Sequence, residues 1–322
     1  MSQTISACIG TFNEEENIAA CIDSVEGVDE VIVADDGSSD ETVAIAERCG
    51  ATVFRRRDWS EPAKQEYVDR FTERFGFAPT FQAGDRIRNG HLEARERFER
   101  ASCDWIVTPD ADERVTWDLP RLKAEVLPVA DQVVSQFVHS HQEDGTPERM
   151  STITKMWRRG MGQIEGRTHT VVLPQGRIVE TDLMRVDHYQ RPGHSQAYVL
   201  PILEYCIVEE DSPRDRFYLG REYYYHHRYD EALAMLDLYL AEATWQPEIG
   251  QARLYAARCY WESDRGDEAR ASCLQAVLIN PDHKEALQLM SELYYEPWRS
   301  KWAYIASNAQ DHDILFRPVL YC

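Results

Sequence analysis

Short apolar runs and amphipathic stretches alternate at the beginning of the chain, and this alternation restricts the fold more than any other feature of the sequence. Apolar runs at 5–9, 31–34 and 51–54 predict strands, whereas residues 15–25 and 41–49 carry apolar side chains at helical spacing. A strand that is followed by a helix and another strand needs a crossover connection, which makes neighbouring strands parallel and covers the sheet with helices. We therefore expect an α/β domain whose ligands bind beyond the carboxyl ends of the strands.

Polar residues follow the first two predicted strands. Thr11 and Asn13 come after the first strand, and the segment "DDGSSD", which begins at Asp35, comes after the second. A tight turn and a helix cap would explain the glycine and the serines. They do not explain why Asp35 and Asp36, which repel each other, stand side by side where a parallel sheet presents its ligand.

A second acidic segment, "TPDADERV", follows the apolar run "WIV". Asp110 and Asp112 are two residues apart, so at the end of a strand the alternation would direct both side chains to the same face. Two converging carboxylates, with Glu113 adjacent, can hold a divalent cation against a diphosphate through hard oxygen ligands. For such a triplet alone, a solvated acidic turn is the alternative.

The stretch 58–84 is polar and aromatic, fits no strand and would hold at most one helix. Inserted loops of this length often serve as lids or substrate platforms. The arginine run at 55–57, just before it, is expected to form a solvated edge, with a contact to phosphate as the alternative. A helix is expected at 89–100. Further strands of a mixed sheet are expected where apolar and polar residues alternate, at 132–139, 152–157, 167–172 and 177–186.

From 195 to about 308 the sequence is helical in character and repetitive. Gly220 and Ala232 in one copy align with Ala257 and Ala269 in the next at the same offset. This pattern is similar to tetratricopeptide repeats, pairs of helices of about 34 residues in which small side chains let the helices approach closely. A generic helical bundle is the alternative.

Several segments of the first part together resemble family-2 glycosyltransferases of the GT-A fold, a Rossmann-like fold of nucleotide-diphospho-sugar transferases. They are "CIGTFNEEENIAACIDSV", "EVIVADDGSSDETVAIAERCGATVF", "RNGHLEARERFERASCDWIVTPDADE" and "KMWRRGMGQIEGRTHTVV". The chain is most similar to members with appended tetratricopeptide repeats, which include peptide S-glycosyltransferases. The expected organisation is a GT-A domain at 1–192 followed by an all-α tetratricopeptide-like domain at 193–322.

The resemblance implies an enzyme that transfers a sugar from a nucleotide-sugar, in particular a UDP-sugar, in a metal-dependent and inverting reaction. The repeat domain favours a peptide or protein acceptor. The nucleotide would lie against Asp36, with Asp35 behind it, because its base and ribose need hydrogen-bond acceptors. The other nucleotide contacts that the resemblance implies are Thr11, Asn13, Glu14, Arg88 and Asn89.

The resemblance also implies a metal site at the second acidic segment. Mn²⁺ or Mg²⁺ would be held by Asp112 and bridged to Asp110. The cation would stabilise the leaving diphosphate, which gives Asp112 a catalytic role. His188 is the expected third ligand, and His194 is the alternative.

The general base is less well defined by the resemblance. Relatives often have a glutamate after the histidine of the segment "GRTH", whereas this chain has Thr170. His169 and Glu165 are the two candidates for taking the proton of the acceptor hydroxyl. Alternatively, the acceptor is a thiolate, which needs little help from a base.

Composition bears on partners and location. The net charge of −21 repels phosphate backbones and counts against nucleic acid or an anionic membrane as a partner. No window approaches the roughly 20 apolar residues of a membrane span, and the scattered cysteines lack the spacing of a metal site. We therefore expect a cytoplasmic protein. Part of the run of tyrosines and histidines at 223–227 is expected to face outward, either as acceptor surface or as a homodimer contact.

Other functions fit parts of the same pattern. The acceptor could be a saccharide or a modified base in phage-type DNA, which a basic stripe around Arg55 and Arg86 would contact. A non-catalytic scaffold with a decayed transferase domain is an alternative from another class. A nucleotidyltransferase would share the metal and nucleotide chemistry but would release pyrophosphate.

Overall fold

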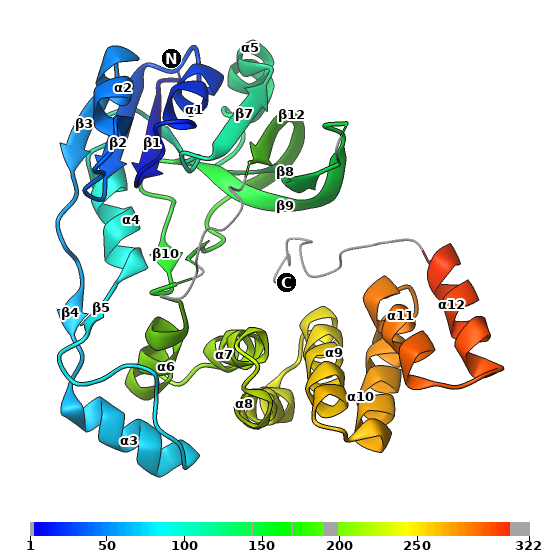
Figure 1. The fold of residues 1–322 in the computed structure, drawn as a ribbon. Helices are drawn as coiled ribbons and strands as arrows, with labels where there is room; N and C mark the ends of the chain where they lie inside the picture. The colour runs from blue at the N-terminus through cyan, green and yellow to red at the C-terminus, as the bar shows by residue number, and fades with distance from the viewer. Residues whose placement is uncertain (1–2, 143, 169, 190–198, 310–322) are drawn as a thin grey trace. The chain divides into compact units, whose positions relative to one another are not determined.

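The computed structural model describes residues 3–142, 144–168, 170–189 and 199–309 (Figure 1). They divide into two compact units, of which the first comprises 3–60 and 88–189 and the second comprises 61–87 and 199–309. The sequence-based division assigned the segment 61–87 to the α/β domain, whereas in the structure it belongs to the helical unit.

An eight-stranded sheet in the order β3-β2-β1-β6-β9-β8-β12-β7 forms the centre of the first unit. One half is parallel and consists of β1 (Ile5–Thr11), β2 (Glu30–Asp35), β3 (Thr52–Arg55) and β6 (Trp105–Val107). Helices α1 (Ile18–Ser24), α2 (Thr42–Arg48) and α4 (Gly90–Glu99) alternate with these strands along the chain. The predicted strand–helix alternation is therefore confirmed, and the burial of Ile5, Val33 and Trp105 fits parallel strands that are covered on both faces.

The other half of the sheet is mixed. β8 (Gln132–His141) runs parallel to β12 (Ile178–His188), whereas β9 (Pro147–Arg158) is antiparallel to both β6 and β8. β7 (Glu113–Trp117) pairs antiparallel with β12. The carboxyl ends of β1, β2, β6, β8 and β12 consequently lie at one edge of the sheet, which we call the carboxyl edge.

Two expected features differ from the structure. The segment 167–172 contributes only the short β11 (Val171–Val172), which pairs with β10 (Ile164–Glu165) outside the main sheet. Asp110 and Asp112 lie in the turn between β6 and β7, so the strand alternation does not set their directions. After β7, the short helices α5 (Leu119–Arg121) and η1 (Leu122–Val126) lead to β8.

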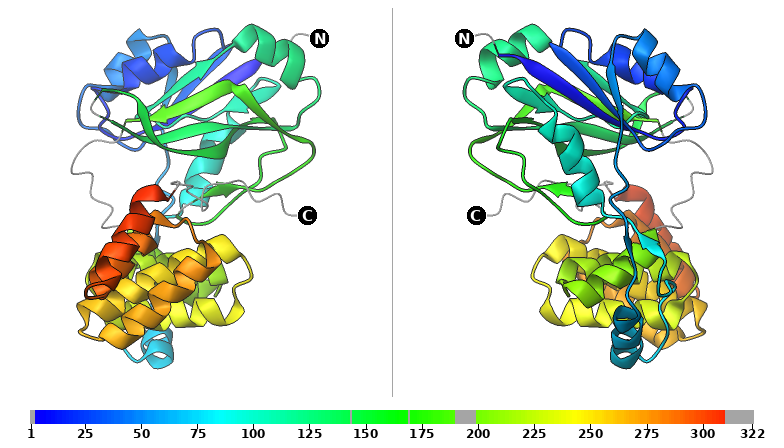
Figure 2. Two further views of the ribbon diagram at one scale, coloured as in Figure 1. Left: turned by 90° about the vertical axis from the view of Figure 1, so that its right-hand side faces the viewer. Right: turned by 90° about the vertical axis from the view of Figure 1, so that its left-hand side faces the viewer.

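Helices make up most of the second unit (Figure 2). They are α6 (Val199–Glu209), α7 (Pro213–Tyr225), α8 (Tyr229–Glu242), α9 (Gln246–Glu262), α10 (Gly266–Ile279), α11 (Lys284–Leu293) and α12 (Trp298–Asn308). A Cβ atom on Gly220 of α7 would lie 2.8 Å from Leu236 Cγ of α8, so the close approach of this helix pair requires a glycine. None of the described helices is both long and apolar enough to cross a bilayer.

The segment 61–87 forms β4 (Glu61–Pro62), α3 (Gln65–Phe75) and β5 (Arg86–Ile87). The expectation of at most one helix in 58–84 is confirmed, whereas the expectation of no strand there is wrong, because β4 pairs with β5. Phe71 of α3 is fully buried in the same apolar cluster as Leu203 and Tyr223. The buried carboxylate of Glu204 accepts hydrogen bonds from the Thr80 backbone N–H (2.6 Å) and the Tyr223 hydroxyl (2.8 Å). These contacts explain why the segment belongs to the helical unit.

Candidate active site

Residues from three separate segments meet at the carboxyl edge of the sheet. The carbonyl of Thr11, the last residue of β1, accepts a hydrogen bond from the backbone N–H of Asp36 (3.0 Å). Asp110 forms an isolated parallel bridge with Gly10. The expected placement of Thr11 and Asp36 at strand ends is therefore what the structure has, and Asp110 lies beside them in the turn after β6.

Asp35 and Asn13 shape the loops at this edge. The carboxylate of Asp35 is buried and accepts hydrogen bonds from the backbone N–H groups of Gly37 (2.9 Å) and Ser38 (3.1 Å). Gly37 has a φ of 94°, which the turn requires and which glycine adopts without strain. Asn13 accepts a hydrogen bond from the Ser39 backbone N–H (2.8 Å), so it ties the loop after β1 to the turn after β2.

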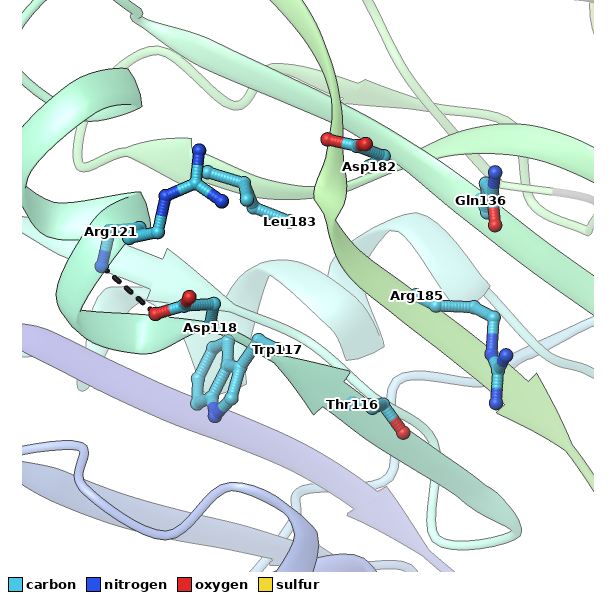
Figure 3. Close-up of a pocket in the computed structure, with 8 residues that line it drawn as sticks. All are labelled: Thr116, Trp117, Asp118, Arg121, Gln136, Asp182, Leu183 and Arg185. Carbon is cyan, nitrogen blue, oxygen red and sulfur yellow. Dashed lines mark hydrogen bonds between the residues drawn. The ribbon is translucent and has the colours of Figure 1, made fainter.

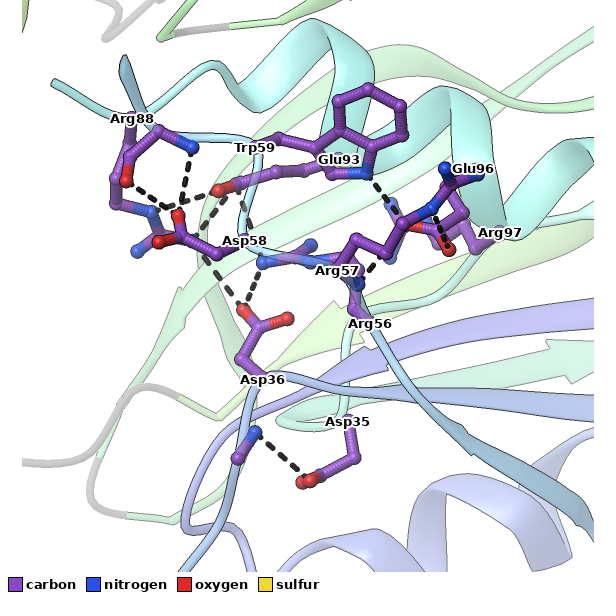
Figure 4. Close-up of polar contacts among 12 residues, drawn as sticks. Asp35, Asp36, Arg56, Arg57, Asp58, Trp59, Arg88, Glu93, Glu96 and Arg97 are labelled. Carbon is purple, nitrogen blue, oxygen red and sulfur yellow. Dashed lines mark hydrogen bonds and ion pairs between the residues drawn. The ribbon is translucent and has the colours of Figure 1, made fainter. Parts of the chain in front are cut away.

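Asp36 lies in a cluster of alternating charges (Figure 4). Its carboxylate forms ion pairs with Arg56 and with Arg88, whose Nη2 lies 3.4 Å away. Both arginines also pair with Glu93 of α4, at 3.3 Å for Arg56 and 2.9 Å for Arg88. Burial raises the pKa of Asp36 to about 6, and the positive charges of Arg56 and Arg88 oppose this increase.

Two polar atoms beside this cluster lack a partner among the described residues. They are Asp36 Oδ1 and Thr11 Oγ1, and both are buried. A buried polar atom without a hydrogen bond costs free energy, so such atoms in a native structure call for an explanation. A bound ligand that donates hydrogen bonds would satisfy both of them.

The remaining predicted nucleotide contacts also lie in the first unit. Asn89 caps α4 by accepting a hydrogen bond from the Leu92 backbone N–H (3.2 Å). Glu14 accepts a hydrogen bond from Asn17 Nδ2 (2.8 Å), and its own backbone N–H donates to Thr42 Oγ1 (2.7 Å).

The arginine run at 55–57 was expected to be a solvated edge, and this is wrong for Arg56. Only 10 % of the Arg56 side chain is exposed, against 73 % for Arg57. Arg56 directly follows β3, and its backbone N–H donates to the carbonyl of Asp35 (2.8 Å), which holds it beside the turn that carries Asp36. Its position at the carboxyl end of a parallel strand is the sequence signal that could have singled out Arg56 as a residue of the site.

Asp112 and His188 form the second part of the candidate site. His188 ends β12, and its Nε2 lies 3.1 Å from Asp112 Oδ2. This hydrogen bond raises the pKa of His188, although burial opposes the increase. The backbone N–H of Tyr189 also donates to the carbonyl of Asp112 (2.8 Å), which holds the turn against the end of β12.

Asp110 faces cations and not Asp112. Its Oδ2 lies 3.2 Å from Lys155 Nζ and its Oδ1 lies 3.4 Å from Arg97 Nη1. Burial raises the pKa of Asp110, but Lys155 and Arg97 outweigh it and lower the pKa overall. Burial raises the pKa of Glu113, whose carboxylate pairs with the same Lys155 at 2.8 Å. No local pattern indicated Lys155 or Arg97, which lie 45 and 13 residues from Asp110 along the chain.

These contacts bear on the expected metal site. Among the described residues, no group of three or more His, Cys, Asp or Glu side chains is arranged to hold a metal ion. Asp112 and His188 alone supply one oxygen and one nitrogen donor. That donor set fits Mg²⁺ or Mn²⁺, which commonly take one or two protein ligands and complete their coordination with substrate phosphates and water.

The structure describes only one of the two candidates for the general base. Glu165 lies in β10 and is exposed. His169 lies outside the described residues, as does His194, the alternative metal ligand.

A pocket in the first unit contains none of the predicted site residues (Figure 3). It is lined by residues of β7, α5, β8 and β12 and of the loop after β7: Thr116, Trp117, Asp118, Arg121, Gln136, Asp182, Leu183 and Arg185. Its arginines have acidic partners, Glu125 for Arg121 and Asp187 for Arg185. The pocket is therefore separate from the residues that meet at the carboxyl edge.

Comparison with known families agrees with both parts of this description. The model of glycosyl transferase family 2 matches residues 6–63, which include β1, β2 and the Asp36 turn. The first unit thus contains a glycosyltransferase family 2 segment. A tetratricopeptide repeat model matches residues 223–293, so the helical unit contains tetratricopeptide repeats.

Among individual relatives, one matches most of the chain at low identity, and others match about a third of it at higher identity. The chain is similar to the lipopolysaccharide core biosynthesis glycosyltransferase LpsC of Rhizobium meliloti (strain 1021), with 25% identity over 231 residues, 66% of this chain and 75% of LpsC. It is 52% identical over 122 residues to an uncharacterized glycosyltransferase of Rickettsia conorii, 37% of this chain and 32% of that protein. The chain thus spans about a third of the length of the Rickettsia relatives.

Solved structures show a weaker likeness. One is glucosyl-3-phosphoglycerate synthase from Mycobacterium tuberculosis in complex with Mn²⁺, UDP-glucose and phosphoglyceric acid. It is 19% identical, covers 64% of this chain and 79% of its own, and has a TM-score of 0.38.

Proposed function

We propose that this protein transfers a sugar from a UDP-sugar to a peptide or protein acceptor, in an inverting reaction that depends on Mn²⁺ or Mg²⁺. The observation that carries the proposal is the pair of buried atoms Thr11 Oγ1 and Asp36 Oδ1, for which the described residues supply no hydrogen-bond partner, at the same edge as the Asp112–His188 pair. A nucleotide diphosphate brings hydrogen-bond donors for the first pair of residues and phosphate oxygens for a cation at the second.

The residues around Asp36 would bind the base and the ribose. Asp36 Oδ1 and Thr11 Oγ1 are available to the N–H and O–H donors of a nucleoside. Arg56 and Arg88 hold the other Asp36 oxygen, so the free oxygen keeps a fixed direction. Asp35 and Asn13 act indirectly, because their side chains hold the turn that carries Asp36.

The residues around Asp112 would act on the leaving group. Asp112 and His188 would hold the cation, which supplies positive charge next to the diphosphate as the glycosidic bond breaks. The hydrogen bond between the two side chains fixes their directions in advance. Glu165 and His169 remain the proposed bases that take the proton of the acceptor.

The peptide or protein acceptor is supported by the repeat unit, since tetratricopeptide arrays commonly present a groove for an extended peptide. A saccharide acceptor is the alternative, and the similarity to LpsC supports it because that protein is named for lipopolysaccharide core biosynthesis. We also propose a cytoplasmic site of action, which the free cysteines in the described residues support.

The test is nucleoside diphosphate release without an acceptor. The purified protein is incubated with UDP-, GDP- and dTDP-sugars and Mn²⁺, and slow hydrolysis of one donor is expected. Release should stop with EDTA and fall about 100-fold or more in Asp112→Asn, because the charge of a bound cation is worth several kcal/mol.

The matched control is Asp182→Asn, which removes an exposed carboxylate of β12 outside the candidate site and should leave release unchanged. No release from any donor, together with no nucleotide binding by calorimetry, would contradict the transferase function. Release of pyrophosphate would point to nucleotidyl transfer instead.

A further inference from the structure

Lys155 of β9 is an internal cation shared by two carboxylates of the acidic turn. Only 12 % of its side chain is exposed, and its Nζ lies 3.2 Å from Asp110 Oδ2 and 2.8 Å from Glu113. Lys155 reaches this turn because β9 pairs with β6, and the backbone N–H of Thr108 donates to the carbonyl of Lys155 (2.9 Å). One ammonium group therefore pairs with two acidic residues of the segment that was expected to bind a metal.

The second oxygen of Asp110 is also occupied. Arg97 Nη1 lies 3.4 Å from Asp110 Oδ1, and 13 % of the Arg97 side chain is exposed. A Cβ atom on Gly10 would lie 2.4 Å from this same Nη1, so the absence of a side chain at the end of β1 makes room for the guanidinium. Both oxygens of Asp110 therefore face cations that the fold holds in place.

Glu113 depends on Lys155 more strongly than Asp110 does. It is 3 % exposed, and its Oε2 accepts a hydrogen bond from the Asp110 backbone N–H (2.9 Å). A buried carboxylate without a paired cation is strongly destabilising. Lys155 therefore fixes the shape of the turn as well as its charge.

The three carboxylates of the turn consequently differ in what they offer a cation. Asp110 and Glu113 are already paired with Lys155. Asp112 instead contacts His188, whose imidazole can itself bind a metal ion. A single carboxylate and an imidazole hold a hard divalent cation weakly, and Mg²⁺ and Mn²⁺ sites of this kind rely on substrate phosphates for the remaining ligands.

We propose that Lys155 is a positioning residue that keeps Asp110 and Glu113 away from the metal ion. The cation is then anchored by Asp112 and His188 alone, and it binds tightly only together with a nucleotide diphosphate. This inference rests on the proposed function, since it concerns the same metal and the same donor.

The test measures Mn²⁺ binding by electron paramagnetic resonance, with and without UDP. The wild-type protein should bind free Mn²⁺ weakly and bind it much more tightly with UDP. Lys155→Met should bind Mn²⁺ without UDP about tenfold more tightly or better, because Glu113 loses its counter-ion and Asp110 keeps only Arg97, so that Asp110 Oδ2 and Glu113 can turn to the metal. Lys155→Arg keeps the positive charge and should behave like the wild type.

A second variant keeps the test readable if Lys155→Met fails to fold. Lys155→Met combined with Glu113→Gln removes the unpaired buried carboxylate but still frees Asp110 Oδ2, so tighter binding of free Mn²⁺ is again expected. Unchanged affinity for free Mn²⁺ in a folded variant without Lys155 would overturn the inference. So would a large loss of Mn²⁺ binding with UDP in Asp110→Asn, because Asp110 would then be a direct ligand.

Failure of the inference can be told apart from failure of the proposed function. Calorimetry with UDP and Mn²⁺ on the wild-type protein tests the donor site by itself. Absence of UDP binding there would contradict the proposed function, whereas the affinities of the Lys155 variants for free Mn²⁺ would still decide the role of Lys155.

Discussion

At the residue scale, the carboxylate of Asp36 is the main hydrogen-bond acceptor of the proposed donor site. One of its oxygens is held by arginines, and the other is buried and lacks a partner among the described residues. Asp36→Asn keeps the shape but removes the charge. UDP binding is then expected to weaken about 10- to 100-fold, since a hydrogen bond to a charged group contributes about 1.5–3 kcal/mol. Calorimetry measures this, and Asp23→Asn, an exposed carboxylate of α1, should bind UDP like the wild type.

The same carboxylate should make stability depend on pH. Burial raises the pKa of Asp36 to about 6 in the folded protein, above the ordinary value of 3.8. Between these values the folded state binds more protons than the unfolded state, so the free energy of unfolding should fall as pH rises from about 4 to 6. The drop attributable to Asp36 should be on the order of 1–3 kcal/mol. Urea unfolding of wild type and Asp36→Asn checks this, and parallel pH curves would contradict it.

At the element scale, the spacing of α7 and α8 depends on Gly220. A Cβ atom there would lie 2.8 and 2.9 Å from Leu236 Cγ and Cδ2, so a larger residue must separate the two helices. Gly220→Val should lower the free energy of unfolding of the helical unit by about 1–3 kcal/mol. Gly266→Ala is the control, because its new Cβ would come no closer than 3.6 Å to a flexible arginine. Thermal unfolding compares the two, and equal midpoints would show that the helices can adjust.

The helices and strands also show which parts of the structure could be predicted from the sequence. The first three strands and two helices were predictable because their apolar periodicity is local, and the Asp112–His188 pair followed from the family resemblance. Lys155 and Arg97 were not predictable, because their contacts with Asp110 depend on how β9 and α4 pack, and no local pattern encodes that. The expected convergence of Asp110 and Asp112 failed for a related reason, since a turn and not a strand carries them.

At the scale of the whole molecule, the chain enters the helical unit twice. The segment 61–87 leaves the first unit just after Trp59, which donates to Glu96 (2.5 Å), and returns at Arg88, which contacts Asp36. The two residues that flank the segment, Trp59 and Arg88, thus contact helix α4 and the candidate donor site, respectively. Its sequence position alone would assign it to the α/β domain, whereas its apolar side chains complement α6.

The membership of this segment can be tested through Phe71. This side chain is fully buried with Leu203 and Tyr223, so Phe71→Ala should destabilise the helical unit by about 3–5 kcal/mol. In hydrogen exchange measured by mass spectrometry, protection should fall together in α3, α6 and α7 and stay unchanged in β1 and β2, because a cooperative unit opens as a whole. Glu73→Ala, an exposed change on the same helix, should leave protection unchanged. If protection fell in β1 and β2 while α6 and α7 kept theirs, the segment would belong energetically to the first unit, and its helix would be an appendage of the α/β domain.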